Sequence, residues 1–172
     1  GINAKLQFGQ KTISIDSSLI GEYNLSNIMA GAAAALSMGI SISKIESAIK
    51  SMPPIPGRME HIPCNCLGKV FVDYAHSPDA YEKLFSNLVN LMDNQVNIFT
   101  VFGCGGNRDT GKRAEMAKIS EKYASFSFVT TDNPRTESLE RINADIIQGF
   151  ASDSYTAILD RKEAITTALK QM

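Results

Sequence analysis

The chain has 172 residues, of which 44% are hydrophobic and 20% are charged, and its formal net charge is −1. This composition is typical of a soluble globular protein, and the nearly neutral charge gives no reason to expect a nucleic-acid or membrane partner. No apolar run reaches the length of about 18 residues that a spanning helix needs, and no secretory leader pattern is visible. We therefore expect a cytoplasmic protein without membrane insertion, and the initial Gly1 in place of methionine suggests a fragment.

The first 57 residues predict a hairpin followed by two helices. Two short alternating runs within residues 4–16 are typical of a β-hairpin. An Ala-rich helix is expected to begin near Asn24 and to end at Gly39. A second helix, "SKIESAIKSM", ends before two prolines, and the run "MPPIPGRM" that contains them predicts a linker with a domain boundary near residue 57.

Beyond this linker, strand-like and helix-like segments alternate regularly. Apolar strands are followed by amphipathic helices four times, which favours an α/β fold with a Rossmann-like, mostly parallel sheet and helices on both faces. The clearest helix follows Ser77, which can cap it, and Pro78, which suits a first helical turn. The expected strands are residues 69–75, 96–103, 125–131 and 155–160, and the expected inner face of the clearest helix is Tyr81, Leu84, Phe85, Leu88 and Leu91.

The cysteine pattern indicates reduced thiols rather than a disulfide framework or a metal site. Cys64, Cys66 and Cys104 make an odd count, and a disulfide framework is typical of much smaller secreted chains. Cys64 and Cys66 form C-x-C rather than the C-x-x-C of a zinc site, and only two histidines are present. We expect packed thiols in a reducing compartment.

Three polar segments follow the first three predicted strands. They read "DYAHSPD" (73–79), "GCGGNRDTGKR" (103–113) and "TDNPRTE" (131–137). Loops that follow neighbouring parallel strands emerge at the same edge of a sheet, where open parallel sheets bind their ligands. The three loops are therefore expected to line one site.

The glycine-rich segment resembles a nucleotide-phosphate loop but departs from it at one position. From Gly106 it reads G-x-x-x-x-G-K, and Arg113 then stands where a Walker A motif has the Ser or Thr that ligates Mg²⁺. Its glycines permit positive φ and close backbone approach, and the following helix N-terminus favours anions. Three interpretations stay open on these residues alone: a Walker-type loop, another anion site in which Arg108 binds a carboxylate or phosphate, or a tight turn.

The other two segments also have a functional and a plain interpretation. Because Asn before Pro starts turns, Asp132, Asn133 and Arg135 could form only a capped turn. Alternatively they bind an amino acid, with Asp132 at its ammonium group and Arg135 at its carboxylate. Asp73 and His76 are candidates for contact with a nucleotide or a metal-bound water, or else they mark an ordinary strand end.

Taken together, five motifs resemble those of the Mur ligase family. The segments "GEYNLSN", "GRME", "DYAHSPDA", "FGCGGNRDTGKR" and "TTDNPRTE" occur in the order and rough spacing of that family, from about residue 18 to residue 172. They are most similar to those of the members that add meso-diaminopimelate. One departure is "SPD", where many relatives have "TPD".

The resemblance implies a domain organisation. Residues 1–57 would be the C-terminal part of the family's central ATPase domain, and residues 58–172 most of its C-terminal amino-acid-binding domain. The family's phosphate loop, the carbamylated lysine that helps to bind Mg²⁺ and the last amino-acid-binding motif would lie outside this chain. The resemblance therefore assigns no metal ligand and no catalytic residue within it.

The resemblance also implies the ligand of the glycine-rich loop. Arg108, Asp132, Asn133 and Arg135 match residues that bind the incoming meso-diaminopimelate, so the loop would not be a phosphate loop. Diaminopimelate is lysine with a second carboxylate, which a buried Arg135 guanidinium would pair with. Lysine would leave that charge unpaired at a cost of roughly 3–5 kcal/mol, enough to exclude it.

Five residues match positions that contact ATP in the family. Asn24 and Asn27 match asparagines of the central domain, with helix capping as the alternative. Arg58 matches an arginine near the ATP phosphates. Asp73 and His76 match residues that approach the nucleotide from the C-terminal domain.

The implied reaction is ATP-dependent ligation of meso-diaminopimelate to UDP-MurNAc-L-Ala-D-Glu through an acyl phosphate, in cytoplasmic peptidoglycan synthesis. ATP and Mg²⁺ would be required, the UDP-linked dipeptide and diaminopimelate would be the partners, and the full-length enzyme is expected to be monomeric. This chain alone is expected to be inactive. The alternatives are a lysine-adding or folylpolyglutamate-type ligase of the same superfamily, or a non-catalytic anion-binding Rossmann-like module.

Overall fold

The computed structural model describes residues 1–92 and 96–172, and these divide into two compact units, each with a hydrophobic core of its own. The predicted domain boundary near residue 57 stays a prediction, because the two short strands that follow it group with the first unit. The first unit comprises Gly1–Pro63 and Val70–Tyr74, and the second comprises Cys64–Lys69 and Ala75–Met172.

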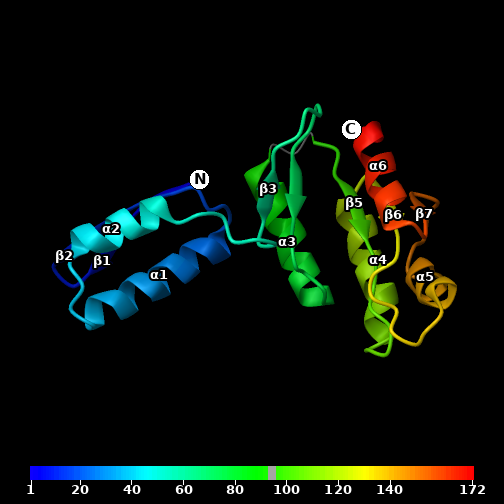
Figure 1. Cartoon of the computed structure of the whole chain (residues 1–172), viewed down its shortest axis with the longest axis horizontal. Coiled ribbons are helices and arrows are strands. Elements are labelled where there is room, and N and C mark those ends of the chain that lie inside the picture. The colour runs from blue at the N-terminus through cyan, green and yellow to red at the C-terminus, as the bar shows by residue number, and fades with distance from the viewer. Residues whose placement is uncertain (93–95) are drawn as a thin grey trace. The chain divides into compact units, whose positions relative to one another are not determined.

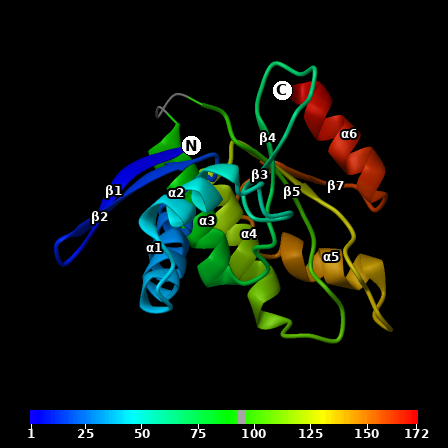
Figure 2. The same ribbon diagram turned by 60° about the vertical axis from the view of Figure 1, so that its left-hand side comes forward.

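A β-hairpin and two helices form the core of the first unit (Figures 1 and 2). Strands β1 (Ile2–Phe8) and β2 (Lys11–Ser17) pair antiparallel, and helices α1 (Glu22–Ser37) and α2 (Ile42–Ser51) follow, as the sequence predicts. The hairpin turn contains Gly9 at a φ of 57°, in the left-handed region that glycine tolerates. Alternate strand residues pack against the helices, and the buried set is Leu6, Ile13, Ile15, Leu19, Ile28, Ala32, Ile45 and Ile49.

The next two strands form a separate hairpin. β3 (Glu60–Ile62) and β4 (Val70–Val72) pair antiparallel, with Glu60 opposite Val72. The expectation that residues 69–75 add a strand to the parallel sheet is therefore wrong for the described part of the chain. A hairpin satisfies the backbone groups of two short strands locally, at a smaller loop-closure entropy than a pairing between distant segments.

Three parallel strands and four helices make up most of the second unit: β5 (Phe99–Phe102), β6 (Phe126–Val129), β7 (Tyr155–Ala157), α3 (Pro78–Leu91), α4 (Gly111–Tyr123), α5 (Leu139–Ile147) and α6 (Arg161–Gln171). The strands lie in the order β5-β6-β7 and all pairs are parallel. Helix α6 packs on β5 and β6 (Figure 1), whereas α4 and α5 cover the other face of β6. The predicted parallel sheet with helices on both faces is confirmed.

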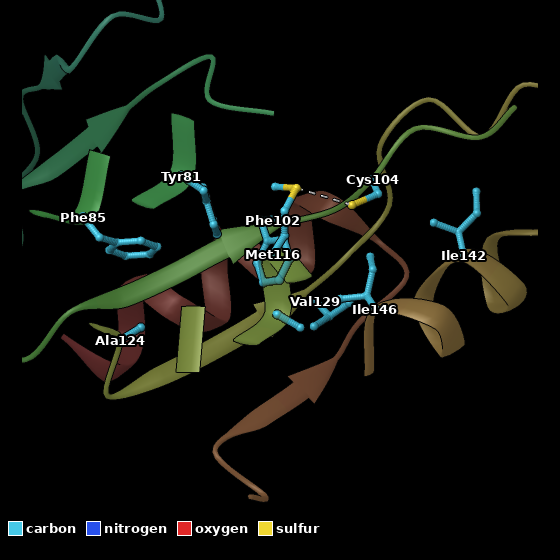
Figure 3. Packing of buried hydrophobic residues seen from close by; sticks show 10 residues of the cluster. Tyr81, Phe85, Phe102, Cys104, Met116, Ala124, Val129, Ile142 and Ile146 are labelled. Carbon is cyan, nitrogen blue, oxygen red and sulfur yellow. Dashed lines mark hydrogen bonds between the residues drawn. The ribbon is translucent and has the colours of Figure 1, made fainter. Parts of the chain in front are cut away.

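The larger core of this unit lies on the side of the sheet that α4 covers (Figure 3). Phe102 of β5 and Val129 of β6 pack there with Met116 of α4 and Ile146 of α5. On the other face Phe128 packs with α6. Neighbouring residues of β6 thus face opposite sides, as the period of two in a β-strand requires, and both faces of the strand are buried.

Helix α3 begins as its sequence predicts. Ser77 Oγ accepts a hydrogen bond from the Ala80 N–H at 3.4 Å, and Pro78 lies in the first turn. Tyr81 is buried, and its hydroxyl is 2.8 Å from Thr100 Oγ1 of β5. Leu91, at the other end, is 52% exposed, so the predicted inner face does not extend to the last turn.

Two of the cysteines are joined, contrary to the expectation of reduced thiols. The loop between β3 and β4 brings the Cα atoms of Cys64 and Cys66 to 5.3 Å, within the range that a disulfide spans, and the two sulfurs are bonded. Cys104 is a buried free thiol. Within the described ranges, no cluster of three His, Cys, Asp or Glu could hold a metal ion, and no helix is long and apolar enough to cross a membrane.

Candidate functional site

Two loops at the carboxyl ends of β5 and β6 are hydrogen-bonded to each other. We call residues 103–110 the glycine loop and residues 131–137 the DNPR loop. The Gly106 N–H donates to the carbonyl of Asn133 at 2.9 Å. The Asn107 carboxamide oxygen accepts from both the N–H and the hydroxyl of Thr136, at 3.0 and 2.9 Å. The Asn107 N–H in turn donates to the Glu137 carboxylate. These two loops therefore lie side by side, as their positions after parallel strands predict. The third predicted segment, residues 73–79, follows β4, which lies in a separate hairpin and not in the parallel sheet.

The glycines of this loop allow neighbouring segments to approach the backbone closely. They are not needed for unusual backbone angles. A Cβ on Gly106 would overlap the carbonyl oxygen of Pro134, with its carbon only 2.7 Å away. Residues with positive φ are instead Asn107, at 51°, and Arg135, at 52°. Asn tolerates this region better than most side chains, whereas Arg does not. The left-handed backbone conformation of Arg135 is therefore unfavourable by itself, and the contacts of the DNPR loop must stabilise it.

The charged side chains of the DNPR loop flank the glycine loop. Arg135 Nη1 donates to the Gly106 carbonyl at 2.6 Å, and the Arg135 N–H donates to the Asn133 carboxamide oxygen at 3.2 Å. A Cβ on Gly105 would lie 3.0 Å from Arg135 Nη1 and 4.0 Å from Asp132 Oδ2. A cation and an anion therefore meet at one short stretch of backbone, while both side chains stay exposed.

Arg108 is exposed in the middle of the glycine loop. It directly follows Asn107, which is bonded to Thr136, and Thr136 directly follows Arg135. The structure thus brings the segments that carry the two arginines together. It differs from the expectation in one respect: Arg135 is exposed in this chain, because its loop is at the surface, rather than a buried guanidinium.

Arg113 is the functional candidate that sequence reasoning missed, since it was considered only as the mismatch with a phosphate loop. Its side chain is fully buried, with Nη2 2.9 Å from Glu137 Oε2 and Nη1 2.7 Å from Asp145 Oδ2. Nη2 also donates to the Gly105 carbonyl at 3.3 Å. Burial alone would lower the pKa of Arg113, but the hydrogen bonds to Asp145 and Glu137 raise it above its ordinary value. Its helical spacing with Met116 and other buried residues of α4 is the signal that would have placed it inside.

Cys104 is the buried free thiol of the glycine loop. Burial, opposed by Lys112 and Arg113 and reinforced by the charge of Asp132, raises the pKa of Cys104 to about 11. The thiol is therefore protonated at neutral pH and is not a nucleophile candidate. Its Sγ lies 3.9 Å from the sulfur of Met116, as a packed core residue would.

In the first unit, Arg58 and Asp73 lie near Tyr23. The Arg58 guanidinium is 5.2 Å from the ring centre of Tyr74, and Asp73 Oδ2 accepts from the Met59 N–H at 2.8 Å. Burial and the charge of Asp73 raise the pKa of Tyr23 to about 12, with Arg58 acting in the opposite direction. The buried Tyr23 hydroxyl has no hydrogen-bond partner among the described residues. Its place inside "GEYNLSN" was the only sequence signal for it.

The remaining predicted nucleotide residues have mixed environments. Asn24 is buried, and its Nδ2 donates to the Ile20 carbonyl at 2.7 Å, a structural contact at the beginning of α1. Asn27 is exposed on the same helix. His76 belongs to the second unit, where its carbonyl accepts from Lys112 Nζ at 2.7 Å. The five residues are thus divided between two units, and their grouping around one nucleotide stays a prediction.

The sequence profile of a known family matches most of this chain. The family is described as "Mur ligase, glutamate ligase domain", and the match covers residues 57–172. The chain belongs to the Mur ligase family. The match includes the hairpin of β3 and β4 as well as both loops of the candidate site.

Curated Mur ligases are similar along the whole chain. The UDP-N-acetylmuramoyl-L-alanyl-D-glutamate–2,6-diaminopimelate ligase of Trichormus variabilis is 40% identical over 174 residues, covering 99% of this chain and 35% of the relative. The protein of the same name from Syntrophomonas wolfei is 38% identical over 172 residues, covering 98% of this chain and 35% of the relative. The chain thus spans about a third of the length of the curated relatives it matches.

Solved Mur ligase structures share the fold. A structure of UDP-N-acetylmuramoyl-L-alanyl-D-glutamate–2,6-diaminopimelate ligase is 35% identical with a TM-score of 0.63, covering 98% of this chain and 34% of that one. A Mycobacterium tuberculosis folylpolyglutamate synthase complexed with ADP has a TM-score of 0.79 at 22% identity, covering 98% of this chain and 37% of that one. The second likeness shows the fold alone.

Proposed function

We propose that this chain supplies the amino-acid site, and part of the nucleotide site, of an ATP-dependent ligase that adds meso-diaminopimelate to UDP-MurNAc-L-Ala-D-Glu. The names of the curated relatives support this substrate pair. The observation that carries the proposal is the bonded pair of loops with Arg108, Asp132, Asn133 and Arg135 at one edge of the sheet. The enzyme would work in the cytoplasm, as a monomer, in peptidoglycan synthesis.

The charges of the two loops suit an amino acid with two acid ends. A guanidinium has five N–H donors, and Arg135 uses Nη1 for the Gly106 carbonyl, so further donors can bind a carboxylate. Arg108 offers a second guanidinium, while Asp132 can accept from an ammonium group. Meso-diaminopimelate carries two carboxylates and two ammonium groups, and lysine lacks one of the carboxylates.

Discrimination against lysine requires more than these loops. An unpaired guanidinium is costly only when it is desolvated, and Arg135 is exposed in this chain. We therefore infer that a covering segment of a full-length ligase, together with the bound amino acid, removes Arg135 from water. Closure about the linker near Arg58 would have the same effect.

The first unit has a place for part of the nucleotide. The buried Tyr23 hydroxyl, unpartnered among the described residues, lies near Arg58 and Asp73, and a polar ligand would satisfy it. We propose that Arg58 faces the phosphates and that Asp73 accepts from a ligand hydroxyl. The family resemblance assigns Asn24, Asn27 and His76 to the same nucleotide. As the family resemblance implies, the main Mg²⁺ ligands are expected elsewhere in the full-length enzyme.

The proposed reaction joins a carboxylate to an amine. ATP supplies the phosphoryl group that activates the D-Glu side-chain carboxylate as an acyl phosphate. The role of this chain is to hold the diaminopimelate amine within about 3–3.5 Å of the acyl carbon, so that a tetrahedral intermediate can form and release phosphate. Asp132 and the two arginines would set that position by binding the other charged groups of the amino acid.

Steady-state kinetics of the full-length enzyme test this function. We expect diaminopimelate-dependent phosphate release and little activity with lysine. Arg135→Ala should raise the KM for diaminopimelate by about 10- to 100-fold, the worth of one charge-assisted hydrogen-bonding group. Lys118→Ala, which removes an exposed cation of α4, is the control and should change nothing.

Two outcomes would contradict the proposal. A preference for lysine over diaminopimelate would favour the lysine-adding alternative. Full ligase activity in both Arg108→Ala and Arg135→Ala would reject the amino-acid site and leave an anion-binding module of another purpose.

A further inference from the structure

We propose that Glu137, held by Arg113, is a positioning residue that fixes the spacing between Arg108 and Arg135. This inference rests on the proposed function, because it concerns the binding of the same amino acid. Neither Glu137 nor Arg113 is expected to touch that ligand. They act through the backbone of the two loops.

Glu137 connects the two loops and α4. Its carboxylate accepts from the Asn107 N–H in the glycine loop, while Glu137 itself belongs to the DNPR loop. The same carboxylate is paired with Arg113, at 2.9 Å between Nη2 and Oε2 and 3.1 Å between Nη2 and Oε1. One side chain of the DNPR loop therefore contacts both the glycine loop and the helix α4 that follows it.

Arg113 gives this carboxylate a fixed partner. The guanidinium is fully buried, whereas the Glu137 and Asp145 side chains retain 20% and 32% exposure. Asp145 lies on α5, and Nη2 of Arg113 also donates to the Gly105 carbonyl. A buried, planar cation with partners in three segments has little freedom to move, so it determines where Glu137 lies.

A second set of hydrogen bonds joins the two loops, and in this set the DNPR loop donates and the glycine loop accepts. The Asn107 carboxamide oxygen accepts from the N–H and hydroxyl of Thr136. Asn107 thus donates to one residue of the DNPR loop through its backbone and accepts from the preceding residue through its side chain. Glycine-loop residue Asn107 is thus hydrogen-bonded to two adjacent residues of the DNPR loop, Thr136 and Glu137.

The connections lie directly beside the ligand-binding candidates. Arg108 follows Asn107, and Arg135 precedes Thr136 and lies two residues before Glu137. A change in the contact between the loops would therefore move both guanidinium groups relative to each other. An error of about 1 Å in the position of a reacting or binding group can cost about 100-fold in rate.

Substitutions of the full-length enzyme separate positioning from general stability. Glu137→Gln keeps the size but removes the charge that pairs with Arg113. Glu121→Gln is the matched control, because the Glu121 carboxylate accepts from the Ala151 and Ser152 N–H groups in a different part of the same unit. Both variants lose a carboxylate that holds a loop, but only Glu137 contacts the glycine loop.

We expect Glu137→Gln to raise the KM for diaminopimelate by about 10- to 100-fold, with an unchanged KM for ATP and a smaller effect on kcat. Glu121→Gln should leave all three parameters unchanged. Asn107→Gly provides a second variant if Glu137→Gln folds poorly, since glycine accepts a φ of 51° but lacks the oxygen that binds Thr136. It should raise the same KM.

Hydrogen exchange of the backbone amides provides a readout that does not depend on activity. In Glu137→Gln the Asn107 and Gly106 amides should exchange at least about tenfold faster while the Ala151 and Ser152 amides do not change, and Glu121→Gln should give the reverse pattern. If the wild-type enzyme ligates diaminopimelate but Glu137→Gln and Asn107→Gly retain its KM, the positioning role is overturned while the proposed function stands. If the wild-type enzyme does not use diaminopimelate, the proposed function fails, and the positioning role for this amino acid fails with it.

Discussion

At the scale of single residues, the glycine loop contacts the backbone of the DNPR loop directly, with no side chain between them. Gly106 lies against Pro134 so closely that no side chain fits between them, and its N–H donates to Asn133. A motif that looks like a phosphate cradle is therefore filled by a neighbouring loop. Its N–H groups are directed at protein acceptors: Gly106 at a carbonyl and Asn107 at the Glu137 carboxylate.

Gly106→Ala is expected to destabilise the chain by about 1–3 kcal/mol, because the new methyl group would overlap the Pro134 carbonyl and force the loops apart. Urea unfolding followed by circular dichroism measures the change. Gly31→Ala is the control: this helical glycine has open space around it, so alanine should stabilise α1 by up to about 1 kcal/mol. Equal stability of Gly106→Ala and wild type would show that the close approach does not exist in solution.

At the scale of elements, ionised carboxylates tie the helices and loops of the second unit together. Glu82 of α3 contacts Lys122 and Tyr123 of α4, and Glu121 of α4 binds the loop before β7. Hydrogen bonds from Lys122 and Tyr123 lower the pKa of Glu82, and those from Ser152 and Ala151 lower that of Glu121. The Asn107 N–H is the main cause of the lowered pKa of Glu137.

These shifts predict an acid-sensitive second unit. A carboxyl whose folded-state pKa lies below its ordinary value of 4.5 stabilises the fold above pH 4.5, and this contribution is lost as the pH falls through the folded-state pKa. The urea midpoint should therefore be constant from pH 7 to about 5 and fall below pH 4.5. Glu121→Gln should lower the midpoint at pH 7 and make the acid decline shallower. An identical pH profile for variant and wild type would contradict the assignment.

At the scale of the whole molecule, the chain consists of two units with separate cores and spans about 35% of its curated relatives. The candidate amino-acid site lies within the second unit, and the residues near Tyr23 lie within the first. The proposed reaction needs both sites together with groups that the described residues do not provide. The candidate amino-acid site is folded here, and the proposed reaction would need a protein as long as the curated relatives.

We therefore expect the 172-residue chain by itself to form no amide bond. With ATP, Mg²⁺, UDP-MurNAc-L-Ala-D-Glu and diaminopimelate, mass spectrometry should detect no tripeptide product, whereas the proposed function predicts that the full-length enzyme forms it under the same conditions. Circular dichroism should show that the chain is nonetheless folded. Turnover by the chain alone would contradict this prediction.

The sequence by itself determined most of the helices, the parallel sheet and two of the three loops predicted to meet at its edge, because periodicity and caps are local signals. It also showed the family, through motifs whose order is read directly. It did not determine that residues 69–75 pair in a hairpin, that Cys64 and Cys66 meet, or that Arg113 is buried between two carboxylates. The hairpin and the Cys64–Cys66 contact depend on the entropy with which a short loop closes, which residue patterns do not report. The burial of Arg113 depends on carboxylates from more distant segments, Glu137 and Asp145, which offset the desolvation of its charge.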